Sequence, residues 1–268
     1  MSVILSDLSW SIDDRTLFSH LDLIFGAERT GLVGRNGTGK TTLLKLISGD
    51  LPLQTGRISV TGSLGVLRQT VQADAVETVA NLFGVTEALA ILNRVESGEA
   101  TMADFEAADW TLEARMIAAL ARVGLEVAPE TRLTTLSGGQ QTRAGLAALV
   151  FSEPDFLLLD EPTNNLDREG RQAVFDLLSG WRKGGIVISH DRELLESMDA
   201  IVELTTLGAT RYGGNWSHYR ARKTLELAAA QADLADAEKR IDTAARTAQI
   251  AAERKARKDS GAEKGREG

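Results

Sequence analysis

Short runs of apolar and β-branched residues alternate with helix-like patterns through about the first 212 residues of the chain. This alternation is typical of a parallel β-sheet whose strands are joined by crossover helices. The runs predict strands at Val3–Leu5, Leu21–Phe25, Gly31–Val33, Ile58–Val60, Leu64–Leu67, Phe156–Leu159, Ile186–Ile188 and Ile201–Leu204. The interval from about Glu77 to Val123 has a helical pattern and few strand signals, which indicates a helical subdomain inserted in the α/β core.

The chain changes character after Tyr219. From there to Ser260 it contains neither glycine nor proline, and the pattern predicts one helix of roughly 60 Å at 1.5 Å per residue. Its apolar positions alternate steps of three and four, the spacing of a narrow coiled-coil seam: Leu227, Ala230, Leu234, Ala237, Ile241, Ala244, Ala248 and Ala251. Because a lone long helix is marginal in water, we expect a partner helix, and we expect the polar end GAEKGREG to fray.

Composition and charge narrow the class of protein. At 268 residues and 43% apolar content, the chain can bury one α/β core or one domain plus an extension. From Tyr219 onward it carries 12 Lys and Arg against 9 Asp and Glu, whereas the remainder carries 18 against 29, so the two parts suit different surroundings. This charge difference also fits an ordinary solvated helix. With no cysteine, no apolar run near 18 residues and no signal-peptide pattern, we expect a soluble, cytoplasmic protein without disulfides, thiolate sites or a transmembrane segment.

The segment GRNGTGKT, Gly34 to Thr41, fits the pattern G-x-x-x-x-G-K-[ST] between a predicted strand and a helix at Thr42–Ile47. Its glycines allow backbone N–H groups to surround phosphate oxygens, and the helix N-terminus adds positive potential. Lys40 would supply charge at the β- and γ-phosphates, and Thr41 would offer a hydroxyl to Mg²⁺. The predicted nucleotide contacts are Gly34, Asn36, Gly37, Thr38, Gly39, Lys40, Thr41 and Thr42. The alternative, a glycine-rich turn without a ligand, is disfavoured by the strand–loop–helix context.

The segment FLLLDE, Phe156 to Glu161, predicts a buried strand that ends in two carboxylates at the ligand-binding edge of a parallel sheet. Asp160 would hold Mg²⁺ through water, and Glu161 would orient or deprotonate the attacking water. Adjacent strand residues point to opposite sides, which gives a reason for two roles. The alternative is an acidic turn, which the nearby phosphate loop disfavours.

The segment LSGGQ, Leu136 to Gln140, predicts a second helix start that suits an anion. Ser137 can cap a helix that runs to about Val150, while Gly138 and Gly139 keep its first turn open to close approach. The motif is short, but it stands 19 residues before the Phe156 strand and after the helical insertion.

GRNGTGKT, LSGGQ and FLLLDEP in this order resemble the nucleotide-binding domain of ABC ATPases over residues 1 to 212. The resemblance implies an α/β fold, a P-loop ABC-type nucleotide-binding domain with an antiparallel β subdomain and a helical subdomain, followed by a long C-terminal helix. We expect the nucleotide-binding domain at 1–218, its helical subdomain at about 72–150, and a truncated helical linker at 219–268.

The resemblance also implies roles for individual residues. Gln69 matches the Q-loop glutamine and His190, in ISHD, the switch histidine that contacts the γ-phosphate. The predicted catalytic residues are Glu161, His190 and Gln69, the predicted Mg²⁺ ligands are Thr41, Gln69 and Asp160, and Asp167 matches the loop that links two active sites. ATP and Mg²⁺ are the implied cofactors.

The adenine contact departs from the family pattern. Family members usually carry an aromatic residue near position 12, where this chain has Ile12. Either adenine packs on Ile12, or Trp10, which could share a strand face with it, takes the aromatic role.

The family resemblance implies an incomplete site in a single cassette. In this family ATP lies between the phosphate loop of one cassette and the LSGGQ of another, here Ser137, Gly138, Gly139 and Gln140. We therefore expect a second cassette, in tandem in a longer chain or as a homodimer partner, and weak hydrolysis by an isolated cassette.

Two further segments resemble the ABC-F group of this family. EPTNNLD is similar to the EPTN-x-LD usual in that group, and YGGNWSHYRARK, Tyr212 to Lys223, resembles the stretch that leads from a first cassette into an interdomain linker. The resemblance implies a protein that acts on the ribosome and tRNA, in translation or antibiotic protection. The stretch from Gln69 to Leu136 leaves room for a helical subdomain but little for a long arm, so we expect a short-arm member, whose basic tail residues would meet RNA phosphates. The alternatives are the ATPase subunit of a membrane transporter and a DNA-associated ABC ATPase.

Overall fold

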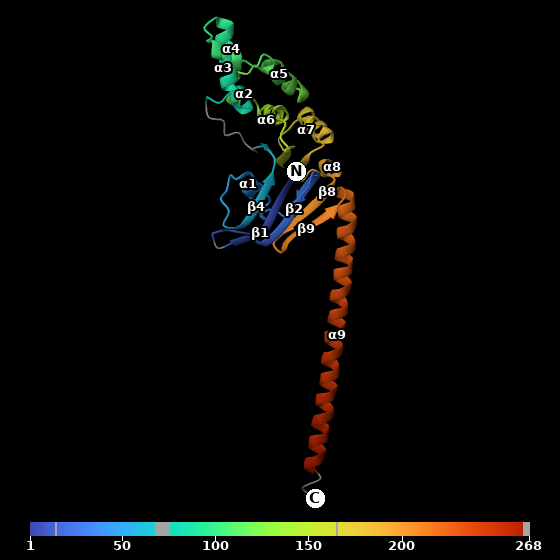
Figure 1. Cartoon of the computed structure of the whole chain (residues 1–268). Coiled ribbons are helices and arrows are strands. Elements are labelled where there is room, and N and C mark those ends of the chain that lie inside the picture. Colours follow the sequence, from blue (N-terminus) through green and yellow to red (C-terminus); the bar gives the residue numbers. More distant parts are fainter. Residues whose placement is uncertain (14, 68–75, 165, 265–268) are drawn as a thin grey trace. The chain divides into compact units, whose positions relative to one another are not determined.

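The computed structural model describes residues 1–13, 15–67, 76–164 and 166–264, and the chain divides into two compact units, Met1–His218 and Tyr219–Gly268. The first unit is an α/β structure with two sheets and a group of helices (Figure 1). The α/β class and the antiparallel β subdomain predicted from the sequence are confirmed.

The smaller sheet is antiparallel, with strand order β2-β1-β4. β1 (Ser2–Ile12) lies between β2 (Arg15–Phe25) and β4 (Thr55–Thr61). Both β1 and β2 extend well beyond the predicted runs, because their remaining residues alternate apolar and polar instead of forming a continuous apolar run. One face of this sheet therefore joins the hydrophobic core of the unit.

The larger sheet has the order β5-β6-β7-β3-β8-β9. Its parallel strands are β5 (Leu64–Leu67), β6 (Phe156–Asp160), β7 (Gly184–Ile188), β3 (Arg29–Val33) and β8 (Ala200–Thr205). Each of the eight predicted strands is present in the two sheets. β9 (Gly208–Gly213), an antiparallel edge strand, was not predicted, because GATRYG has no apolar run.

The parallel arrangement brings three loops to one edge of the larger sheet. β3 leads into the glycine-rich loop, β6 ends at Asp160, and β7 is followed directly by Ser189 and His190. In a parallel sheet the carboxyl ends of the strands share an edge, so these loops meet although they are far apart in the sequence.

Helices flank this sheet and form the insertion. α1 (Lys40–Ser48) follows the glycine-rich loop, and α6 (Gly138–Ser152), α7 (Arg168–Gly180) and α8 (Arg192–Glu196) connect later strands. The interval predicted to be helical holds α2 (Val79–Phe83), α3 (Thr86–Ser97), α4 (Met102–Ala107) and α5 (Leu112–Arg122), and a short 3₁₀ turn at Leu133–Thr135 precedes α6. α3, α4 and α5 gather away from the sheets (Figure 1).

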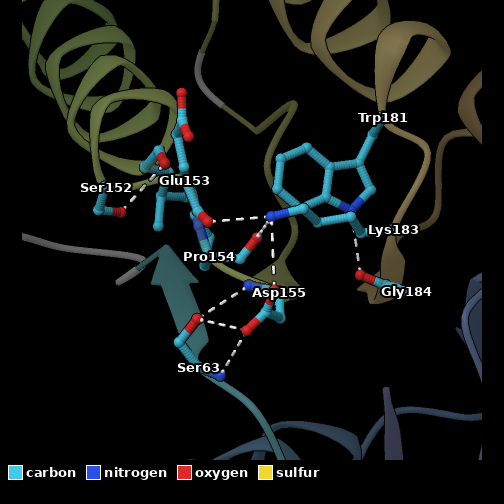
Figure 2. Close-up of polar contacts among 9 residues, drawn as sticks. Ser63, Ser152, Glu153, Pro154, Asp155, Trp181, Lys183 and Gly184 are labelled. Atoms are coloured by element: carbon cyan, nitrogen blue, oxygen red, sulfur yellow. Dashed lines mark hydrogen bonds and ion pairs between the residues drawn. The ribbon is translucent and has the colours of Figure 1, made fainter.

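A polar cluster fixes the start of β6 (Figure 2). Lys183 Nζ donates to the carbonyl oxygens of Glu153 at 3.1 Å and Pro154 at 2.9 Å, and lies 3.5 Å from Asp155 Oδ1. Asp155 Oδ2 accepts hydrogen bonds from the backbone N–H and the hydroxyl of Ser63, which hold the pKa of the Asp155 carboxyl below its ordinary value. The cluster thus joins the residues that precede β6 to Ser63, which precedes β5, and to Lys183, which precedes β7.

The second unit is helical and belongs to α9 (Trp216–Lys264), which begins in the first unit. Within it, ion pairs four residues apart join Arg222 to Glu226 and Arg246 to Asp242. Leu227, Leu234 and Ile241 are exposed, and the side chains of Ala244, Ala248 and Ala251 lie outside the described ones. The coiled-coil seam stays a prediction. In the ranges described, no helix combines the length and apolarity needed to cross a membrane.

Candidate active site

The loop between β3 and α1 is shaped for close contact with an anion. Gly34 has a φ of 154°, and a Cβ there would lie 2.3 Å from the carbonyl oxygen of Leu204, so only glycine fits. Gly39 has a φ of 95°, and its added Cβ would lie 2.8 Å from the Phe18 ring. No side-chain hydrogen bond caps the N-terminus of α1, which leaves the N–H groups of its first turn for a ligand.

Lys40 is buried at the first position of α1, and its Nζ donates to the carbonyl oxygens of Gly34 at 2.9 Å and Arg35 at 3.2 Å. Burial lowers the pKa of Lys40, and the charges of Glu161 and Asp160 oppose that shift. A cation is thus held beside the glycine-rich loop, where it can also contact a phosphate.

Asp160 and Thr41 meet between the end of β6 and the start of α1. Burial raises the pKa of the Asp160 carboxyl, and a hydrogen bond from Thr41 and the charges of Lys40 and Lys45 oppose this rise. A hydroxyl and a carboxylate are oxygen donors of the kind that Mg²⁺ prefers, so these residues fit the ion. Gln69, the third predicted ligand, lies outside the described residues.

Mg²⁺ at this site would also need the phosphates of a ligand. The described residues contain no cluster of three or more His, Asp or Glu side chains that could hold a metal ion by themselves. This accords with the usual binding of Mg²⁺ through one or two protein groups together with substrate phosphates.

Glu161 is turned out of the strand by its backbone. Its φ is 48°, its N–H donates to Ile188 O at 2.9 Å, and its carbonyl oxygen accepts from Asn164 N at 3.1 Å. Because β6 ends at Asp160, this turn separates the two carboxylates, not the strand alternation that the sequence suggested. A positive φ at a residue other than glycine costs free energy, so the hydrogen bonds on both sides of Glu161 are needed to hold this turn.

The Glu161 carboxylate is held by His190. The His190 backbone N–H donates to Oε2 at 3.3 Å, and His190 Nε2 lies 3.4 Å from Oε1. The Glu161 side chain is 10% exposed, and its burial raises the pKa of the carboxyl, although the His190 contacts oppose this effect. A carboxylate with a raised pKa, held in one orientation, suits a general base.

A cavity of about 510 Å³ joins these groups. It is within the usual range for small-molecule sites. The residues that line it are Ile12, Arg15, Leu17, Asn36, Gly37, Gly39, Lys40, Thr41, Thr42, Asp160, Glu161, Asn164, Ile188 and His190. Of the other loop residues predicted as contacts, Gly34 accepts from Lys40, and Thr38 is buried with its hydroxyl donating to Arg35 O at 2.9 Å.

Arg15, Leu17, Asn164 and Ile188 line the cavity but were not predicted to do so. Arg15 and Leu17 begin β2, and no local motif marks them. The one available signal for Arg15 and Leu17 was their position just after Ile12, which was already expected to contact adenine.

Trp10 is not placed to stack on adenine in the way that was expected of an aromatic residue near position 12. Its side chain is 9% exposed, belongs to the hydrophobic core and donates from Nε1 to Pro52 O at 3.3 Å. Ile12 is 51% exposed and lines the cavity. Of the two alternatives drawn from the sequence, the one that used Trp10 is therefore wrong.

The LSGGQ segment starts α6 as predicted. The Ser137 hydroxyl accepts from Gln140 N at 3.3 Å, and Gln140 Oε1 accepts from Ser137 N at 2.9 Å, which forms a capping box. As far as the chain is described, Ser137, Gly138, Gly139 and Gln140 do not line the 510 Å³ cavity. The two predicted anion-binding segments therefore do not form one site among the described residues of this chain.

Asp167 caps the next helix, α7, and accepts from Gly170 N at 2.8 Å. Its other carboxylate oxygen lies 3.9 Å from Nη2 of Arg143, a buried residue of α6. The segment that follows Glu161 thus reaches the helix that LSGGQ begins. Asn165, in the same segment, lies outside the described residues.

Comparisons with known proteins agree with this geometry. A family model described as "ABC transporter" matches residues 23–164. The chain is 35% identical over 244 residues to the tylosin resistance ATP-binding protein TlrC of Streptomyces fradiae, which covers 80% of this chain and 44% of TlrC. It is 32% identical over 239 residues to the energy-dependent translational throttle protein EttA of Mycobacterium tuberculosis, covering 80% of this chain and 42% of EttA.

A transporter component is similar as well. The biotin transport ATP-binding protein BioM of Rhizobium etli is 34% identical over 193 residues, covering 72% of this chain and 84% of BioM. Among solved structures, a dimeric ATP-binding cassette in a post-hydrolysis state bound to ADP and Pi has a TM-score of 0.62 at 19% identity, covering 79% of this chain and 98% of that one. This likeness shows the fold. The chain spans less than half the length of TlrC and EttA.

Proposed function

The chain belongs to the ABC transporter family of ATP-binding cassettes, and on this premise we propose that it is the ATP-hydrolysing cassette of an ABC-F-type protein that acts on the ribosome. TlrC and EttA are ABC-F proteins, so the resemblance to this group predicted from EPTNNLD and YGGNWSHYRARK is confirmed. The observation that carries the proposed hydrolysis is the convergence of Lys40, Asp160, Glu161 and His190 on one cavity.

The phosphates of ATP would lie on the glycine-rich loop, with Lys40 sharing its N–H donors between the loop carbonyls and the β- and γ-phosphate oxygens. Thr41 and Asp160, with Gln69, would hold Mg²⁺. The ion, when bound, neutralises part of the charge on the phosphates. Glu161 accepts the proton of the attacking water, and His190 orients Glu161 and contacts the γ-phosphate.

The proposed mechanism requires a second cassette. The LSGGQ segment lies outside the cavity of its own cassette among the described residues, so it is available to cover ATP bound to another. We propose that this partner is a tandem cassette or a second copy of the chain. Either arrangement would leave an isolated cassette with weak Mg²⁺-dependent hydrolysis.

The proposed role on the ribosome rests on the ABC-F relatives and on the tail. We propose that residues 1–218 are the cassette and that residues 219–268 begin a linker whose basic residues approach RNA phosphates. ATP would bring two cassettes together, closure would move the linker against RNA, and hydrolysis would reset it. The names of EttA, a translational throttle, and TlrC, a tylosin resistance protein, support the ribosome as the target.

A transporter ATPase is the second candidate, because BioM is matched over 84% of its length. The experiment that separates the two uses Glu161→Gln in the full-length protein. With hydrolysis blocked, ATP should retain the protein on ribosomes in a sedimentation assay at moderate salt. ADP, and the double variant Lys40→Ala/Glu161→Gln, should not. If ATP adds no retention, the ribosome proposal fails, and ATP-dependent co-purification with a membrane protein would favour transport.

A further inference from the structure

The residues that line the cavity come from two parts of the unit. Lys40, Thr41, Asp160, Glu161 and His190, at the edge of the larger sheet, suit phosphates and a metal ion. Ile12, Arg15 and Leu17 come from the end of β1 and the start of β2. If the phosphates contact the first group, the second group remains for the nucleoside.

We infer that Arg15 determines how the nucleotide base is held: its guanidinium stacks on one face of the base, while Ile12 and Leu17 supply apolar contact. This inference rests on the proposed binding of ATP and adds to it a base site without an aromatic residue.

The first support is the position of the Arg15 guanidinium. Arg15 pairs with Ile12 across the β1–β2 ladder, and its Nη2 donates to Gly37 O in the glycine-rich loop at 3.0 Å. The side chain therefore reaches from the antiparallel sheet to the glycine-rich loop along the wall of the cavity. A Cβ built on Gly37 would lie 3.7 Å from Nη2 and 3.8 Å from Nη1, so the guanidinium lies beside this glycine.

The second support is the chemistry of the group. A guanidinium is planar and weakly hydrated, and it stacks on aromatic faces in a way that a lysine ammonium does not. The bond to Gly37 engages one of its five N–H donors and anchors the guanidinium beside the loop, which reduces the conformational freedom that is lost when a base arrives.

The third support is that the nearby aromatic side chains are already engaged in other contacts. Trp10 is buried and bonded to Pro52, and the Phe18 ring packs against the glycine-rich loop at Gly39. Ile12 is 51% exposed at the cavity and offers apolar surface but no π-face. Among the lining residues from β1 and β2, Arg15 is the one with a planar group that can stack on a base.

The test compares binding of Mg·ATP and of inorganic tripolyphosphate, which has no base, to the chain by titration calorimetry. Arg15→Ala should weaken ATP binding about tenfold and leave tripolyphosphate binding within about twofold of wild type. Arg15→Lys should lose nearly as much ATP affinity, because it keeps the charge without the plane. The double variant Ile12→Tyr/Arg15→Ala should regain most of the ATP affinity, because an aromatic ring then supplies the stacking. Arg57→Ala, at an exposed site on β4 outside the cavity, is the matched control and should bind both ligands as wild type does.

Two outcomes would overturn the inference about Arg15 and leave the proposed function standing. Equal losses of ATP and tripolyphosphate affinity in Arg15→Ala would place Arg15 at the phosphates, and unchanged ATP affinity would remove it from the nucleotide altogether. Lys40→Ala separates these results from a failure of the proposed function. If wild type and Lys40→Ala bind ATP equally, or if neither binds it, the proposed ATP site fails and this inference fails with it.

Discussion

Nε2 of His190 lies 3.4 Å from Oε1 of Glu161, while the backbone N–H of the same histidine donates to Oε2 at 3.3 Å. One residue thus approaches both oxygens of the carboxylate. The pair arises because β6 and β7 are neighbours in the sheet, with Asp160 opposite Ile188, so the residues that follow the two strands meet.

Replacing His190 should slow hydrolysis more than it weakens binding. In His190→Ala the backbone N–H contact with Glu161 remains, but the imidazole that would meet the γ-phosphate is lost. We expect kcat to fall about 10- to 100-fold with a small change in KM, measured by phosphate release. His20→Ala is the matched control, since His20 is exposed on β2 beside Asp7. Equal rates in the two variants would remove His190 from the reaction.

Burial raises the pKa of Glu161, and this gives hydrolysis a pH dependence. A general base must be ionised, so activity is lost as pH falls through the raised pKa. The acidic limb of kcat/KM should therefore lie above the pH at which an ordinary glutamate titrates. Rates measured from about pH 5 to about pH 8 would show this limb, and ATP binding to Glu161→Gln over the same range would separate it from effects on binding. A rate that stays constant down to about pH 5 would contradict a raised pKa in the base.

Removing the cap at Asp167 should destabilise α7. Asp167→Ala deletes the acceptor for Gly170 N and should reduce the free energy of unfolding by about 1 kcal/mol, or Tm by about 2–4 °C. Asp167→Asn keeps a side-chain oxygen that can accept this bond, and it should melt within about 1 °C of wild type. Thermal unfolding followed by circular dichroism measures both. Equal losses in the two variants would mean that the carboxylate charge, and not the cap, stabilises the helix start.

The proposed base site, formed by Ile12, Arg15 and Leu17, should discriminate weakly between purines. Ile12 and Leu17 are apolar, and stacking on Arg15 depends on the π-face that every base presents. We expect Mg·GTP to bind within about fivefold of Mg·ATP, and Arg15→Ala to weaken both by similar factors. Competition against a fluorescent ATP analogue measures the ratio. A preference for ATP above about fiftyfold would require a hydrogen-bonding group that reads adenine.

The strands and motifs around the phosphate loop could be predicted, because they depend on local patterns that are visible in the sequence. Phe156–Leu159 is buried on both faces of the sheet, so it reads as an unbroken apolar run, and Gly34 must be glycine because the backbone of Leu204 passes beside it. Ser137 and Gln140 are spaced for a capping box, and they form one.

Other features depend on contacts between distant segments. β9 is a polar edge strand that forms by pairing with β8. Arg15 reaches the cavity because the start of β2 lies beside the glycine-rich loop, where its guanidinium bonds to Gly37. Trp10 is buried in alternation with Leu8, but the register of β1 against β2 shifts after Trp10, and Ile12 is exposed at the cavity instead of sharing the face of Trp10. The turn at Glu161 is set by its hydrogen bond to the next strand.

The central claim is that this cavity binds ATP through Lys40 and cleaves it through Glu161. The most direct test is a single-turnover experiment with γ-labelled Mg·ATP, at high concentrations of wild-type chain, Glu161→Gln and Lys40→Ala. Glu161→Gln should bind ATP as tightly as wild type while phosphate release falls about 100-fold or more, and Lys40→Ala should lose binding. Phosphate release from Glu161→Gln at the wild-type rate, or wild-type ATP affinity in Lys40→Ala, would contradict the claim.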